Sequence, residues 1–350
     1  MDWSLVATFA TFLGVLTVLV TAHELGHFVV ARVAGIRVLE FGFGYPPRVA
    51  SFTVGETTYS LNVLPLGGFV RMDGETGEGD VEGSFAAQPK LARAAVLVAG
   101  SAMNLLLAPL CLATALMLGE MVPCDGCGRV QVYEVQAGTA SQVAGVRDGD
   151  VITSISGTPV TDAAGVRAAV RASDGRSVVL KLVRAGAVVE LPVTPRVNAQ
   201  TGVPALGVAI GPEYVLERRS FISAFPTAIT RAGNMAVSLV SGLVRAFEPE
   251  AQVQLAGPVG IAEMTGRAAR QGAPTLLQFT AFLSINLAIF NLVPIPGLDG
   301  ARLLFVGIER IRGRRVSPRI EGAMHLAGML LLIAIMLVVS FRDIQRLIAS

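Results

Sequence analysis

The chain has 350 residues, of which 52% are hydrophobic and 15% are charged, whereas ordinary soluble domains are about 25% charged. Its mean hydropathy is +0.61. This composition excludes an ordinary soluble globular protein and indicates an integral membrane protein with some soluble mass attached. The formal net charge is only +2, which gives no indication of nucleic-acid binding.

Four apolar stretches are long enough to cross a bilayer, which takes about 20 residues each. We expect them in residues 1–33, 92–120, 272–305 and 321–342. A cleaved signal peptide does not fit the N-terminus, because Met1-Asp2-Trp3 has no positive charge. Cleavage would also separate a His-Glu motif, at the end of the first span, from its anchor.

Basic residues gather in the two short connections that follow the first and third spans. Such loops stay cytoplasmic, so we expect both termini and the large central region on the outer side. The motif histidines then lie toward the cytoplasmic side. The basic residues are Arg32, Arg37, Arg48, Arg71, Lys90 and Arg93 in the first connection, and Arg302, Arg310, Arg312, Arg314, Arg315 and Arg319 in the last.

The sequence His23-Glu24-Leu25-Gly26-His27 ends the first span. Histidines at i and i+4 share one face of a helix and can bind one metal ion, and Glu24 can accept a proton from the attacking water. The alternative is two histidines that are satisfied at a helix end. We favour a metal site, because ionisable residues inside a span are costly and usually functional.

A catalytic zinc site usually has three protein ligands, so a third ligand is needed. Asp299 follows the third span, directly after Pro294 and Pro296 break the helix. We expect Asp299 to complete the site. Two alternatives remain: Asp299 caps the next helix, or His325 in the fourth span is the ligand.

Residues 36–90 are rich in glycine and in β-forming residues. We expect a hairpin of two strands, Thr57–Val63 and Gly67–Met72, in a membrane-associated β element that presents an edge to an extended substrate. A plain cytoplasmic hairpin is the alternative. The candidate substrate-binding residues are Gly42, Gly44, Gly67, Gly68 and Phe69 in this element, with Asn104 in the second span and Asn291 in the third. For Asn104, helix-to-helix packing is the alternative role.

Residues 123–197 change in character to a soluble α+β domain. Ala140-Ser-Gln-Val-Ala-Gly-Val146, Gly149-Asp-Val-Ile152 and Ile155-Ser-Gly157 resemble a PDZ domain of the bacterial protease type. PDZ domains bind an extended peptide or chain end by strand addition; the alternative is a folded spacer. Just before this domain's first strands, Cys124 and Cys127 allow a small disulfide. We expect residues 203–271 to be an amphipathic helical linker and 306–320 to be a basic cytoplasmic loop.

The motifs H-E-L-G-H (His23–His27) and N-x-x-P-x-P-x-L-D-G (Asn291–Gly300), with a PDZ-like region between them, resemble the bacterial site-2 proteases, in particular the regulator of sigma-E protease type. The resemblance implies one zinc ion bound by His23, His27 and Asp299, and Glu24 as catalytic acid and base. It also implies that Gly42 and Gly44 belong to a membrane-dipping loop and that Asn291 orients the substrate.

The expected fold is an α-helical polytopic membrane protein with four transmembrane helices, a membrane-associated β element and one extracytoplasmic PDZ domain. The resemblance implies a multi-pass protein of the bacterial cytoplasmic (inner) membrane that cleaves single-span membrane proteins within the lipid bilayer, such as anti-sigma factors or remnant signal peptides. The alternative function is a non-catalytic membrane PDZ scaffold or chaperone with a zinc site. A zinc-responsive transporter is less favoured, because the chain shows no clear internal repeat.

Overall fold

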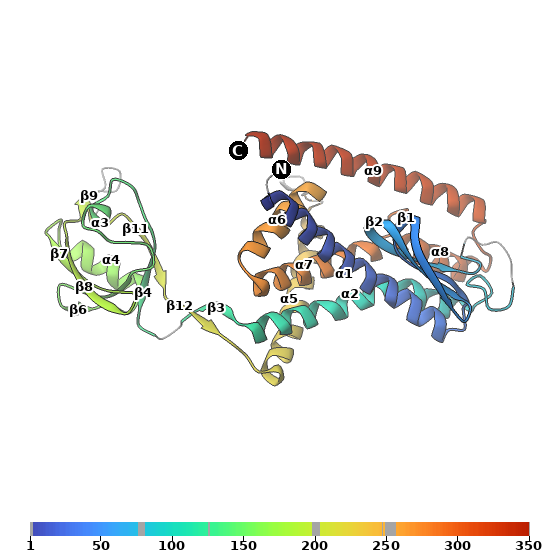
Figure 1. The fold of residues 1–350 in the computed structure, drawn as a ribbon, viewed down its shortest axis with the longest axis horizontal. Helices are drawn as coiled ribbons and strands as arrows, with labels where there is room; N and C mark the ends of the chain where they lie inside the picture. The colour runs from blue at the N-terminus through green and yellow to red at the C-terminus, as the bar shows by residue number, and fades with distance from the viewer. Residues whose placement is uncertain are drawn as a thin grey trace. The chain divides into compact units, whose positions relative to one another are not determined.

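The computed structural model describes residues 3–75, 81–124, 127–197, 204–246, 248 and 257–349, and it divides the chain into two compact units (Figure 1). Met1–Leu118 and Arg219–Ser350 form the first unit, and Gly119–Arg218 form the second. Small parts of the predicted regions lie outside the described residues: 1–2, 76–80, 125–126, 203, 247 and 249–256.

The first unit contains helices and one β hairpin, and four of the helices are long and apolar enough to span a membrane. Among the described residues these spans are Leu5–Val33, Lys90–Leu118, Ala273–Leu292 and Arg319–Gln345, which confirms the prediction of four. The helices are α1 (Trp3–Val33), α2 (Lys90–Leu118), α5 (Phe221–Arg245), α6 (Pro258–Arg270), α7 (Ala273–Leu292), α8 (Asp299–Arg312) and α9 (Pro318–Ala349).

Helix α2 lies at the centre of this unit and packs against α1, α5, α7 and α8. Small residues let the helix axes approach closely. Ala108 of α2, Ala224 of α5 and Ala281 of α7 are fully buried in one apolar cluster. A Cβ at Gly26 of α1 would collide with the carbonyl group of Ala99 in α2. The first span is therefore held with its motif directly against α2.

The predicted third span, 272–305, is two helices. Helix α7 ends at Leu292 and α8 begins at Asp299, because Pro294 and Pro296 cannot continue a helix. Helix α8 then runs into the predicted loop 306–320 as far as Arg312. Its apolar residues, such as Phe305 and Val306, are buried, and it ends at Gly313 in the left-handed conformation.

The β element differs from the predicted hairpin. Strand β1 (Val38–Val54) pairs with one long strand, β2 (Thr57–Met72), and the turn lies at Gly55 and Glu56. The prediction placed the turn at residues 65–68, because Pro and Gly are typical turn residues. These residues instead form a bend inside β2: the register passes from Tyr45↔Leu64 to Phe43↔Gly68.

This bend folds the long hairpin over itself. Gly42 pairs with Phe69 and also with Ser60, so the first half of β1 lies between the two halves of β2. Within the described residues, the segment Gly68–Arg71 of β2 has strand partners only in β1. It is therefore an edge.

The second unit is an α+β domain with a six-stranded sheet in the order β11-β4-β5-β7-β8 and β6 paired to β5. Helix α4 covers the sheet, because Val166 and Val170 join the core of Val132, Ile152 and Leu180. The elements are β3 (Glu120–Pro123), β4 (Val130–Val135), α3 (Ala140–Val143), β5 (Val151–Ile155), β6 (Thr158–Pro159), α4 (Ala163–Ala172), β7 (Val178–Arg184), β8 (Ala187–Val193), β9 (Arg196–Val197), β10 (Pro204–Ala205), β11 (Val208–Pro212) and β12 (Tyr214–Glu217).

The second unit extends beyond the predicted boundary at residue 197. Strand β11 pairs with β4, and β12 pairs with β3, so the first part of the predicted helical linker 203–271 belongs to the domain. These strands are short, and only Glu213 lies between them. Because their partner strands lie much earlier in the chain, no local sequence pattern predicts β11 and β12.

Candidate active site

The two histidines of the motif are brought together by helix α1. His23 and His27 are one turn apart and buried, and their ring centroids lie 4.7 Å apart. The Nδ1 atom of His27 donates a hydrogen bond to the carbonyl oxygen of Val96 in α2 (2.8 Å). This bond puts the ring proton on Nδ1 and leaves the Nε2 lone pair free to bind a metal.

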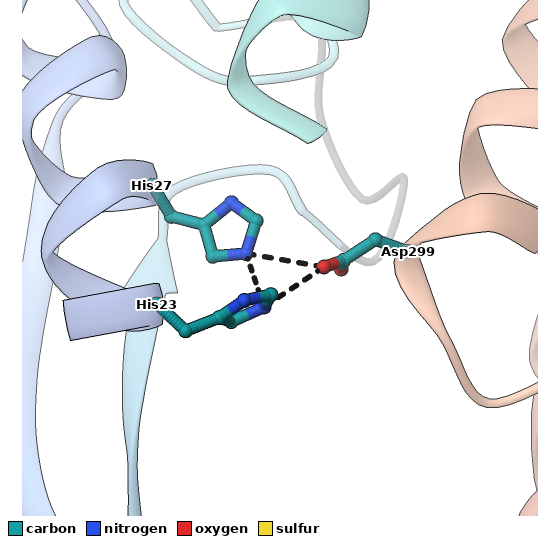
Figure 2. Close-up of side chains that lie close together, drawn as sticks. All are labelled: His23, His27 and Asp299. Carbon is teal, nitrogen blue, oxygen red and sulfur yellow. Dashed lines mark hydrogen bonds and ion pairs between the residues drawn. The ribbon is translucent and has the colours of Figure 1, made fainter. Parts of the chain in front are cut away.

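Asp299 reaches the histidines from α8, as Figure 2 shows. Its Oδ2 atom lies 3.1 Å from Nε2 of His23 and 3.2 Å from Nε2 of His27. The chain reverses tightly before it: a Cβ at Gly300 would collide with the backbone of Leu292 and Val293. The break between α7 and α8 therefore aims the carboxylate back at α1.

These three side chains fit a metal ion. Among the described residues, they form the group that could hold a metal ion. Their candidate ligand atoms all lie within 4.8 Å of one another. Two imidazole nitrogens and one carboxylate oxygen form a donor set typical of catalytic zinc. Gly100 of α2 makes room for them, since a Cβ there would collide with Nε2 of His27 and with the ring of His23.

Glu24 shares a cavity of about 620 Å³ with the candidate metal-binding group of His23, His27 and Asp299. Glu24 lies beside strand β2: a Cβ at Gly68 would be 3.6 Å from its Cγ atom. The cavity is lined by α1, by the edge of β2, by the residues around the α7–α8 break and by α9. The lining residues are Val20, His23, Glu24, His27, Tyr45, Gly68, Phe69, Val70, Met72, Glu75, Leu97, Leu287, Asn291, Gly297, Leu298, Asp299, Arg302, His325, Leu326 and Met329.

The other predicted site residues divide into two groups. Asn291, Gly68 and Phe69 line the cavity, whereas Gly42, Gly44, Gly67 and Asn104 are not in its lining. Gly42 and Gly44 lie within the sheet, where the Gly44 carbonyl accepts a hydrogen bond from Asn62 (3.1 Å).

Asn104 is fully buried beside His23. Its Nδ2 atom lies 3.4 Å from Nδ1 of His23, and its Oδ1 atom has no hydrogen-bond partner among the described residues.

Sequence reasoning missed two polar cavity residues, Glu75 and Arg302, which form an ion pair. Arg302 lies three residues after Asp299, on the same face of α8. Its position relative to Asp299 was the available signal. His325 also lines the cavity but is not part of the metal-ligand group.

Together, a two-histidine and one-carboxylate site with a neighbouring glutamate, set among membrane-length helices, defines a membrane metallopeptidase. Residues 11–335 match Peptidase family M50. The chain therefore belongs to this family, the site-2 proteases.

Curated relatives agree over nearly the whole chain. It is 34% identical to a putative zinc metalloprotease of Clostridium perfringens, CPE1693, over 93% of this chain and 95% of the relative. It is 32% identical to a putative zinc metalloprotease of Nostoc sp., all3971, over 92% of each chain. It is 29% identical to the regulator of sigma-W protease RasP of Bacillus subtilis, over 98% of this chain and 99% of the relative. The chain is therefore a membrane-bound zinc metalloprotease.

Proposed function

We propose that this protease hydrolyses peptide bonds inside the transmembrane segments of single-span proteins, with anti-sigma factors and remnant signal peptides as the substrate classes. The observation that carries the proposal is that Glu24 and the three ligand side chains share one cavity within a unit of membrane-spanning helices. The name of the Bacillus subtilis relative, a regulator of sigma-W protease, supports a substrate in sigma-factor control.

The residues of the site have separate roles in hydrolysis. His23, His27 and Asp299 would hold zinc, a Lewis acid that would polarise the scissile carbonyl and acidify the attacking water. Glu24 accepts the proton of that water and passes it to the leaving amine. Asn291, which lines the cavity, hydrogen-bonds the main chain of the substrate.

Strand β2 supports an extended substrate. Its segment Gly68–Arg71 pairs only with β1 among the described strands, and Gly68, Phe69 and Val70 line the cavity next to Glu24. A transmembrane helix hides its backbone hydrogen bonds, so it must unwind before cleavage. A free strand edge offers the unwound segment new backbone partners.

Asn104 serves as a positioning residue for His23 rather than as a substrate ligand. When Nε2 of His23 binds zinc, its Nδ1 atom carries the proton and needs an acceptor. A half-turn of the Asn104 amide places the unpartnered Oδ1 against Nδ1. In that orientation Oδ1 of Asn104 accepts a hydrogen bond from the N–H at Nδ1 of His23, so each atom has a partner.

The soluble unit serves as a PDZ domain that binds an extended peptide or chain end. Strand β11 pairs with β4 on one side, and α4 packs beside it. No other described strand pairs with β11, so a peptide can add to its free edge next to α4.

The membrane is the bacterial cytoplasmic (inner) membrane, with both termini and the soluble unit outside and the zinc site toward the cytoplasm. Two features support this placement. Basic residues gather in the connections that follow the first and third spans, and such connections stay cytoplasmic. Cys124 and Cys127 form a disulfide, and disulfides persist in oxidising compartments.

The test is cleavage of a single-span model substrate by the purified protein in detergent, with the cut position read by mass spectrometry. We expect a cut inside the hydrophobic segment. Helix-breaking Gly-Pro substitutions at the cut should increase the rate. A cut only in the soluble flanks would contradict the proposal.

A further inference from the structure

Two backbone N–H groups near the end of strand β2 are bound by carboxylates of the cavity. The N–H of Val70 donates a hydrogen bond to Glu24, and the N–H of Met72 donates one to Oε2 of Glu75 (3.3 Å). All four residues line the cavity. Strand β2 therefore connects the proposed base, Glu24, to Glu75 through two adjacent turns of its backbone pleat.

Glu75 also contacts helix α8. Its other carboxylate oxygen, Oε1, forms an ion pair with Nη1 of Arg302. The side chain of Arg302 is 32% exposed and that of Glu75 is 19% exposed, so the pair is better shielded from water than an ordinary surface ion pair. Arg302 lies three residues after Asp299 on α8, the helix that supplies the candidate metal ligand.

These contacts join two elements that otherwise have different neighbours. Strand β2 packs against β1 and α1, whereas α8 packs against α2 and α7. Val70 of β2 and Val306 of α8 share one apolar cluster, but apolar contacts are non-directional and do not fix a register. The Glu75–Arg302 pair is directional. It connects Glu24, through β2, to Asp299, through α8.

We propose that the Glu75–Arg302 ion pair positions Glu24 relative to the metal ligands. This inference rests on the proposed function, in which Glu24 is the base. A base must lie within hydrogen-bond reach of the attacking water, and a displacement of about 1 Å can slow a reaction about 100-fold. Neither Glu75 nor Arg302 belongs to the group that could hold the metal, so loss of the pair slows the chemical step while zinc stays bound.

The test measures kcat, KM and zinc content for the cleavage of a single-span model substrate by full-length Glu75→Gln and Arg302→Gln. Glu75→Gln keeps the size of the side chain but leaves one acceptor oxygen for two donors, Arg302 and the N–H of Met72. We expect kcat to fall about 10- to 100-fold in each variant, with KM within about threefold of the wild type and zinc content unchanged.

The two variants also separate positioning from electrostatics. Glu75→Gln removes a negative charge from the cavity and Arg302→Gln removes a positive one, so an electrostatic effect on Glu24 would change kcat in opposite directions. Opposite changes would overturn the inference, as would wild-type kcat in both variants. Loss of zinc would overturn it too, because the pair would then act on the metal ligands.

A second comparison tests whether the pair acts through Glu24. Added to Glu24→Gln, Glu75→Gln should slow the residual cleavage less than about twofold, since no base remains to be misplaced; the full loss there would contradict the inference. Asp73→Asn is the matched control. Asp73 directly follows β2 and pairs with Arg37 (2.7 Å), but it is not in the cavity lining, so this variant should keep the kcat of the wild type. A loss of kcat as large as that of Glu75→Gln would contradict the inference.

The proposed function and this inference fail separately. Cleavage by Glu24→Gln at the full rate would contradict the role of Glu24 as the base. Slow cleavage by Glu24→Gln, together with wild-type kcat in Glu75→Gln and Arg302→Gln, would overturn this inference alone.

Discussion

Replacement of Asn104 by Leu tests whether this residue orients His23. Leu has the same branching and the same number of side-chain heavy atoms, with methyl groups in place of the amide oxygen and nitrogen. Asn104 is fully buried, so the fit of these larger groups is checked by the stability of the zinc-free variant. The N–H at Nδ1 of His23 then loses its acceptor, which costs about 1–3 kcal/mol for a buried donor. Because that proton is fixed on Nδ1 only when Nε2 binds zinc, the cost falls mainly on the zinc-bound state.

We therefore expect Asn104→Leu to weaken zinc binding about 10- to 100-fold, measured by competition with a calibrated chelator on the purified protein. Asn104→Asp keeps an acceptor oxygen at the same place and should retain zinc affinity within about threefold. Thermal stability of the zinc-free forms serves as the folding control. Unchanged zinc affinity in Asn104→Leu would refute the positioning role.

Three further outcomes are expected. Gly100→Val should abolish zinc binding, measured by metal content, because its side chain would occupy the space of the His23 and His27 rings; normal zinc content would contradict the geometry. Val70→Pro removes the edge N–H of β2 that hydrogen-bonds Glu24 and should lower cleavage about tenfold while zinc content is kept; undiminished cleavage would show that this N–H serves neither Glu24 nor a bound substrate. Burial acts to raise the pKa of Asp150, but hydrogen bonds from Arg184 and from the Arg147 backbone hold it below its ordinary value. The second unit should therefore lose stability as the pH falls below about 4, and Asp150→Asn should flatten this dependence in thermal unfolding followed by circular dichroism.

The helical part of the fold could be predicted because its signals are local. Apolar runs of sufficient length define the spans, and the i, i+4 spacing alone places His23 and His27 on one helix face. Asp299 could be inferred from chemistry, since a carboxylate at the end of an apolar helix needs a compensating partner.

The remaining features depend on contacts between distant parts of the chain. Pro65 and Gly67 favour a turn, but pairing along all of β1 and β2 makes them a bend. Strand β11 is too short to recognise without its partner β4. The placement of Asn104 behind His23 and of His325 at the cavity wall depends on how α2 and α9 pack, which no motif encodes.

The central claim is that Glu24 performs chemistry without holding the metal. Zinc content and cleavage of a single-span substrate should be measured together for the wild type and Glu24→Gln. We predict one zinc ion in both proteins, with cleavage about 10²- to 10⁴-fold slower in the variant. Full cleavage by Glu24→Gln would contradict the mechanism, and loss of its zinc would contradict the assignment of the metal to His23, His27 and Asp299.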